Sequence, residues 1–163
     1  MAILKAGEKT FLVSPDHKED IPDGNVIILR PCFPLSVFGY GWHSTTQNFI
    51  RHMELIDFSG KNVLDIGTGC GILALLASKL GAYSVLGIDT NSQAIENSKL
   101  QSEANKIVID FECQSYMDLV SSFDIVLANL DFPEIELDKI RSLVKLFGIL
   151  IRIEDSNVIR EDF

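Results

Sequence analysis

The sequence has 163 residues, of which 47% are hydrophobic and 23% are charged, and this is typical of one soluble globular domain with a sizeable core. The apolar runs are too short and interrupted to span a membrane, and three cysteines without metal-ligand spacing favour a reducing cytoplasm over a disulfide or zinc framework. A net charge of −9 without a Lys/Arg cluster argues against free nucleic acid as a partner and is better matched by a basic protein.

The first 30 residues predict a strand pair ahead of the main fold. Residues 9–13 and 25–29 have strand-forming composition, and turn-forming residues separate them, so we expect a short N-terminal β-hairpin. Residues 31–43 are rich in Pro, Gly and aromatic side chains and predict an ordered loop. A capping box then indicates a helix over residues 44–57, with Ser44 as the N-cap and Gln47 reaching back to it.

From residue 60 the sequence alternates between strand and helix patterns. The expected strands are residues 61–66, 83–88, 107–112, 124–128 and 147–153. The expected helices are residues 71–80, 91–104 and 135–146. Five strands with helical crossovers predict an α/β fold, a Rossmann-like doubly wound parallel sheet over residues 31–163. We expect a single domain that covers residues 1–163.

The strongest functional signal is a glycine turn. An apolar strand at 63–66 is followed by Gly67, Gly69 and Gly71, immediately before the next helix. Alternate glycines let the backbone turn sharply and approach a ligand, and the first amides of the helix face that ligand. The G-x-G-x-G spacing differs from the G-x-G-x-x-G of dinucleotide sites, so it favours S-adenosyl-L-methionine as the cofactor.

Two acidic residues accompany this turn. Asp65, just before the first glycine, can hold the cationic amino end of the methionine moiety, directly or through water. Asp89 ends the next strand, where its carboxylate can accept hydrogen bonds from two ribose hydroxyls. Asp89 could instead cap the following helix, because Asp89, Thr90 and Asn91 are all residue types that cap helices.

Four other polar residues have both a functional and a structural interpretation. Asn129 ends the fourth expected sheet strand, where its amide could meet the reacting methyl group or its acceptor, or could simply bind local backbone. Gln114 and Ser115 end the third strand and could meet the adenine edge or open a short helical segment. His43 is interpreted as structural, and no Ser-His-Asp, Cys-His or metal constellation can be assembled from the spacing.

Residues 38–46, Phe-Gly-Tyr-Gly-Trp-His-Ser-Thr-Thr, closely resemble the F-G-T-G-x-H-x-T-T signature of the PrmA family. Members of this family are S-adenosylmethionine-dependent methyltransferases of the eleventh protein of the large ribosomal subunit. The resemblance continues through the glycine turn and covers most of the chain, from residue 3 to residue 153. By this resemblance the cofactor-contacting positions are Thr46, Gly67, Asp89 and Asn129.

The sequence also departs from the family pattern. Tyr40 stands in place of a small threonine, Thr68 in place of a cysteine, and Asp131 in place of a leucine. We expect the family's N-terminal recognition domain to be absent, and the C-terminal antiparallel strand pair to be lacking, because only about ten residues follow the last expected strand. A sheet edge left exposed in this way could pair with a second copy of the chain and give a homo-oligomer.

These observations predict a cytoplasmic S-adenosyl-L-methionine-dependent methyltransferase that acts on a basic or ribosomal protein, with Asn129 orienting the acceptor. The cofactor-binding residues in this interpretation are Thr46, Asp65, Gly67, Gly69, Gly71, Asp89 and Asn129. Two alternatives stay open. One is a cofactor-binding module that is inactive alone or is completed by a partner chain, and the other is a nucleotide-dependent oxidoreductase.

Overall fold

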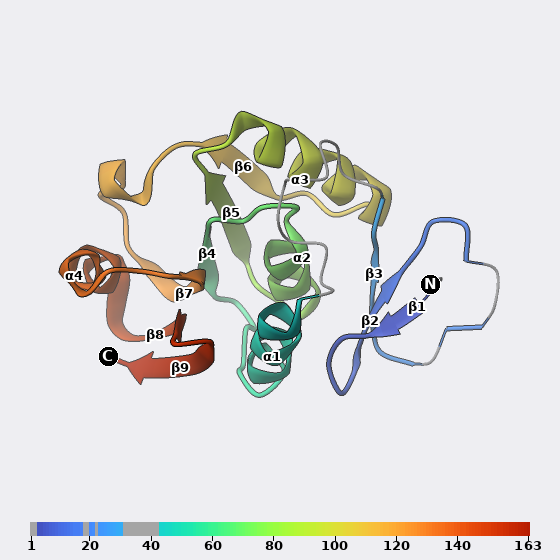
Figure 1. Ribbon diagram of the computed structural model, residues 1–163, viewed down its shortest axis with the longest axis horizontal. Coiled ribbons are helices and arrows are strands. Elements are labelled where there is room, and N and C mark those ends of the chain that lie inside the picture. The colour runs from blue at the N-terminus through green and yellow to red at the C-terminus, as the bar shows by residue number, and fades with distance from the viewer. Residues whose placement is uncertain (1–2, 18–19, 22, 31–42) are drawn as a thin grey trace.

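A six-stranded sheet in the order β6-β5-β4-β7-β8-β9 forms the centre of the computed structural model, which describes residues 3–17, 20–21, 23–30 and 43–163 (Figure 1). Its strands are β4 (Asn62–Ile66), β5 (Ser84–Asp89), β6 (Asp110–Cys113), β7 (Phe123–Asp131), β8 (Val144–Glu154) and β9 (Asn157–Asp162). Strands β4 to β8 pair in parallel. The chain runs outward from β4 to β6 and returns to β7 on the other side of β4, so the strand order switches direction between β4 and β7.

Helices cover both faces of this sheet and confirm the predicted α/β fold. They are α1 (Ser44–Met53), α2 (Ile72–Lys79), α3 (Ser92–Asn105), the single turn η1 (Tyr116–Asp118) and α4 (Glu134–Ser142). Figure 1 shows α1, α2 and α3 on one side of the sheet and α4 on the other. None of the helices in the described part of the chain is long and apolar enough to cross a membrane.

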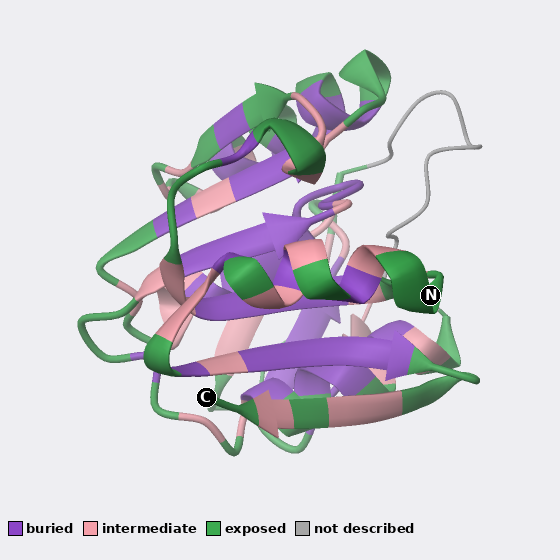
Figure 2. Ribbon diagram, turned by 90° about the vertical axis from the view of Figure 1, so that its left-hand side faces the viewer, coloured by how far each residue is buried: buried purple, intermediate pink, exposed green. Residues whose placement is uncertain are grey.

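The central strands are buried on both faces, as Figure 2 shows. Val63 belongs to the apolar cluster under α1 and α2, whereas its neighbour Leu64 belongs to the cluster under α4. Successive side chains of a strand point to opposite faces. The near-continuous apolar runs of β4 and β7 therefore reflect a parallel sheet covered on both sides.

The N-terminal strands form a separate three-stranded sheet of β1 (Ile3–Lys5), β2 (Thr10–Val13) and β3 (Asn25–Ile28). The prediction of a hairpin between residues 9–13 and 25–29 is wrong, because β2 and β3 run parallel. The hairpin instead joins β1 to β2. The carboxylate of Glu54, which follows α1, accepts the N–H groups of Glu8 and Lys9 in the hairpin turn at 2.7 and 3.0 Å. At three residues, β1 is too short to show a strand period in the sequence.

Helix α3 fixes the far edge of the small sheet through amide side chains. Asn105 accepts the N–H of Ile28 and donates to its carbonyl, both at 2.8 Å. Gln101 accepts the N–H of Arg30 at 2.8 Å and donates to its carbonyl at 2.7 Å. These two side chains replace the hydrogen bonds that a further strand would supply.

The C-terminal end differs from the expectation. An antiparallel strand, β9, pairs with β8, where the C-terminal strand pair was expected to be lacking. Its Glu161 accepts hydrogen bonds from Arg152 of β8 at 2.7 Å and from Arg141 of α4 at 2.9 Å. Arg152 is only 6% exposed, so this carboxylate balances a buried charge and ties β9 to both elements.

Candidate functional site

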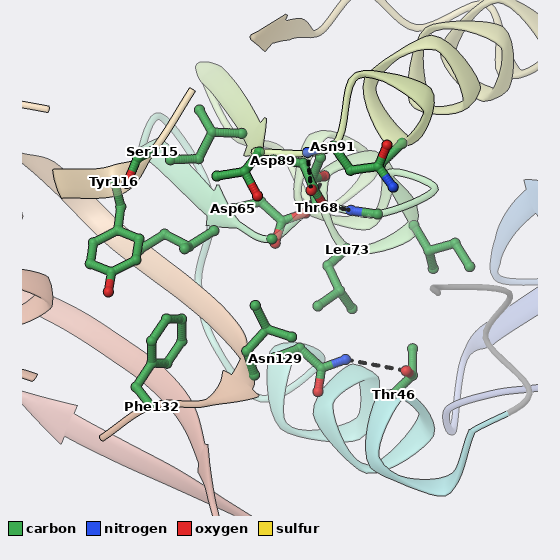
Figure 3. A pocket seen from close by; sticks show the side chains of 18 of the residues that line it. Thr46, Asp65, Thr68, Leu73, Asp89, Asn91, Ser115, Tyr116, Asn129 and Phe132 are labelled. Carbon is green, nitrogen blue, oxygen red and sulfur yellow. Dashed lines mark hydrogen bonds between the residues drawn. The ribbon is translucent and has the colours of Figure 1, made fainter. Parts of the chain in front are cut away.

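A cavity of about 560 Å³ opens at the carboxyl ends of the parallel strands, beside the point where the strand order switches (Figure 3). Its lining comes from residues 65–69 at the end of β4 and beyond it, 88–91 at the end of β5 and beyond it, 114–116 after β6, and 129, 130 and 132 at the end of β7. His43 and the first turns of α1, α2 and α3 complete it. Sites for small molecules and cofactors enclose about 300 to 1,000 Å³ and prefer this position in open α/β sheets.

The glycine turn leads from β4 into α2. Gly67, Gly69 and Gly71 have φ values of +67°, +55° and +79°, in the left-handed region that favours glycine. Gly67 and Gly69 line the cavity. A Cβ atom at Gly67 would collide with the side chain of Leu130. Gly71 is not among the lining residues and is instead the N-cap of α2, packed closely against Phe111.

Asp89, at the end of β5, holds this turn. Its Oδ2 accepts the N–H of Gly69 at 3.0 Å and its Oδ1 accepts the N–H of Asn91 at 2.9 Å. Of the three possible caps Asp89, Thr90 and Asn91, the N-cap of α3 is Asn91, which accepts the N–H of Gln93 at 3.0 Å. Asp89 therefore serves the cavity wall rather than the helix cap, and its carboxylate retains lone pairs for further donors.

Asp65 is the most deeply buried acid that lines the cavity, at 1% exposure. Its Oδ2 accepts the Thr68 hydroxyl at 2.7 Å, and the backbone N–H of Ala74 in the first turn of α2 also donates to it. Burial raises the pKa of the Asp65 carboxyl to about 7, opposed by these two hydrogen bonds and assisted by the charge of Asp89. Burial therefore leaves this carboxyl only partly ionised at neutral pH.

Helix α1 reaches the cavity with its first turn, and its N-cap is His43 rather than Ser44. His43 has the extended backbone of a cap, at φ −70° and ψ 136°, and its carbonyl accepts the first helical hydrogen bond from Gln47 at 3.2 Å. The His43 ring accepts the N–H of Thr45. The expected capping box is therefore wrong by one residue. The remaining residues of the expected loop at 31–43 lie outside the described residues.

Thr46 and Asn129 meet at one wall of the cavity although 83 positions separate them in the chain (Figure 3). The amide nitrogen of Asn129 donates to the Thr46 hydroxyl at 3.2 Å. The amide oxygen of Asn129 is buried and has no hydrogen-bond partner among the described residues. A buried acceptor without a donor is costly in a protein interior, so this atom is suited to a ligand N–H or O–H.

An aromatic pair that the sequence analysis missed forms another wall. The rings of Tyr116 and Phe132 meet edge to face, with centroids 5.5 Å apart. The Tyr116 hydroxyl donates to Glu136 of α4, and burial together with this carboxylate raises the pKa of Tyr116 to about 12. Ser115 is the N-cap of η1, so it opens a short helical turn, while Gln114 and Ser115 both line the cavity.

The chain is similar to known proteins of one family. A family model described as ribosomal protein L11 methyltransferase (PrmA) matches residues 4–151. A ribosomal protein L11 methyltransferase from Cupriavidus pinatubonensis is 36% identical over 127 residues, which cover 78% of this chain and 41% of the relative. The same enzyme from Chlorobaculum parvum is 34% identical over 157 residues, which cover 86% of this chain and 53% of the relative.

Among solved structures, the ribosomal protein L11 methylase of Lactobacillus delbrueckii subsp. bulgaricus superimposes with a TM-score of 0.78 at 30% identity. The match covers 93% of this chain and 79% of that one. The chain spans about half the length of the curated relatives that it matches.

Proposed function

This chain belongs to the family of ribosomal protein L11 methyltransferases (PrmA), and we propose that it transfers a methyl group from S-adenosyl-L-methionine to an amino group of a protein. The observation that carries the proposal is the convergence on one cavity of the glycine turn, two carboxylates and the Asn129 oxygen, which has no hydrogen-bond partner among the described residues.

The residues present fit this cofactor. The backbone at Gly67 and Gly69 can approach an adenosine without a side chain between them. Asp89 would bind the ribose hydroxyls while it keeps its bonds to the turn. Asp65 would receive the cationic amino group of the methionine moiety, and Thr46 offers a hydroxyl on the same side as Asn129.

When bound, S-adenosyl-L-methionine supplies a methyl group that is already activated by its sulfonium. The chain then has to position the acceptor and exclude water. The Asn129 oxygen can accept an N–H of the incoming amine and so orient its lone pair. An amine must be neutral to attack, and burial among groups such as Phe132 disfavours its protonated form.

The acceptor class follows from charge and from the relatives. A net charge of −9 suits a basic protein. The curated relatives carry the name of ribosomal protein L11, which makes that protein the first acceptor to test. Because the chain spans about half of their length, recognition of that protein by this chain is part of the proposal.

Calorimetry with S-adenosyl-L-methionine, S-adenosylhomocysteine and NAD, followed by transfer of a labelled methyl group to ribosomal protein L11 and to a panel of basic proteins, tests the proposal. We expect binding of both sulfur ligands, no response to NAD, and label on at least one protein. Tight binding of NAD alone would replace the proposal with an oxidoreductase. Binding of the cofactor without transfer to any protein would leave the inactive binding module.

Pairing of two copies through a sheet edge is a further part of the proposal. The edge beyond β8 is β9, which carries Arg160, Glu161 and Asp162. Charged edge strands resist pairing with another chain. Light scattering at several protein concentrations distinguishes a dimer from a monomer, and a mass of one chain throughout would remove this part.

A further inference from the structure

Thr68 is fixed at three points in the middle of the glycine turn. Its N–H donates to the carbonyl of Ile88 at 2.9 Å, and its own carbonyl accepts the N–H of Gly71 at 2.8 Å. Its hydroxyl donates to Oδ2 of Asp65 at 2.7 Å. With its backbone held to β5 and its χ1 rotation restricted by β-branching, Thr68 presents this hydroxyl in one direction.

Among the described residues, the carboxyl that Thr68 holds has donors but no opposite charge beside it. Asp65 accepts from the Thr68 hydroxyl and the Ala74 N–H, and the charged side chain that acts on it is another acid, Asp89 of β5. Of the lining residues that the structure describes, His43 at the start of α1 is the basic one. A buried carboxylate in these surroundings is stabilised strongly by a ligand that brings a cation.

Within the cofactor site proposed above, we infer that Thr68 is a positioning residue whose hydroxyl orients the Asp65 carboxyl to receive the ammonium group of the methionine moiety. Two bonds, from Thr68 and Ala74, leave lone pairs of this carboxylate free for that group.

The test compares two ligands that differ only at the methionine end. S-Adenosylhomocysteine carries the ammonium group, whereas 5′-methylthioadenosine keeps the adenosine and the sulfur but lacks it. We expect Thr68→Val, which preserves shape, to weaken S-adenosylhomocysteine binding about tenfold at pH 7, on the scale of a hydrogen bond to a charged group. The affinity for 5′-methylthioadenosine should stay unchanged. Thr68→Ser, which keeps the hydroxyl, should bind both ligands as the wild type does.

Equal losses for the two ligands would mean that Thr68 only supports the fold of the turn, and an unchanged affinity for S-adenosylhomocysteine would mean that its hydroxyl does not act on Asp65. Either result overturns the inference. Failure of the wild type to bind either ligand would instead overturn the proposed cofactor. If Thr68→Val does not fold, Thr68→Cys retains a weak donor, and a smaller loss confined to S-adenosylhomocysteine is then the supporting result.

Discussion

Replacing Asp65 by Asn should stabilise the ligand-free protein at alkaline pH while it weakens cofactor binding. The Asn side chain keeps an oxygen that can accept the Thr68 hydroxyl and the Ala74 N–H, but it removes the charge. The two effects have opposite signs because the buried carboxylate is unfavourable without a cation and favourable with one.

The size of the stability effect follows from the pKa of Asp65, which burial raises from 3.8 to about 7. The folded state therefore binds this proton more tightly than the unfolded state does. No cost arises below pH 3.8, where the carboxyl is neutral in both states, and the cost grows as the pH rises through 7. With 1.36 kcal/mol per pH unit, the full cost is about 4 kcal/mol, and about 2.5 kcal/mol of it develops between pH 5 and pH 8.

Urea unfolding of the wild type and of Asp65→Asn at pH 5 and pH 8 measures this cost. Other groups titrate in both proteins, so the quantity of interest is the difference in unfolding free energy between the two at each pH. We expect the variant to gain about 2.5 kcal/mol on the wild type between pH 5 and pH 8. A difference that is the same at both pH values would refute the assignment of a buried, titrating carboxyl to this position.

Three other substitutions probe the turn, the ribose ligand and the C-terminal strand. Gly67→Ala should abolish cofactor binding, whereas Gly60→Ala, at a similar positive φ with open space around it, should only lower stability by about 1 kcal/mol. Calorimetry measures cofactor binding by the two variants, and thermal melting measures their stability. Equal behaviour of the two variants would contradict the argument that the backbone at Gly67 approaches the cofactor closely. Asp89→Ala should weaken S-adenosylhomocysteine binding by about 1.5 to 3 kcal/mol, and an unchanged affinity in a folded variant would exclude Asp89 as the ribose ligand. Glu161→Gln should lower the unfolding free energy by about 2 kcal/mol, because it leaves the buried Arg152 with a weaker partner. An unchanged free energy in urea unfolding would show that β9 does not depend on this ion pair.

The strand-turn-helix unit could be predicted from the sequence because its determinants are local. The apolar run of β4, the three glycines and Asp89 each follow from the identity and spacing of neighbouring residues. The strand β8 is harder to predict from the sequence. Val144 pairs with Phe123, but regular pairing resumes only at Ile149, and the residues between form an irregular stretch in which Phe147 has φ +64°. An interrupted register of this kind leaves no strand period to detect.

The polar and aromatic contacts of the cavity could not be predicted in the same way. The Thr46–Asn129 hydrogen bond and the Tyr116–Phe132 ring pair join positions on different elements. Neither contact is visible until the sheet brings those elements together. The hydroxyl of Thr68 is different, since it lies three residues from Asp65, and a serine or threonine so close to a strand-end acid was a signal that the sequence offered.

The amide side chains of α3 impose an order on folding. The three strands of the small sheet are three or four residues long, too short for independent stability in water. One of their edges depends on Gln101 and Asn105, which lie more than seventy positions further along the chain. During synthesis these strands leave the ribosome before α3 does, and this edge stays unpaired until α3 has emerged and docked, so the small sheet is exposed to proteases and chaperones for that time.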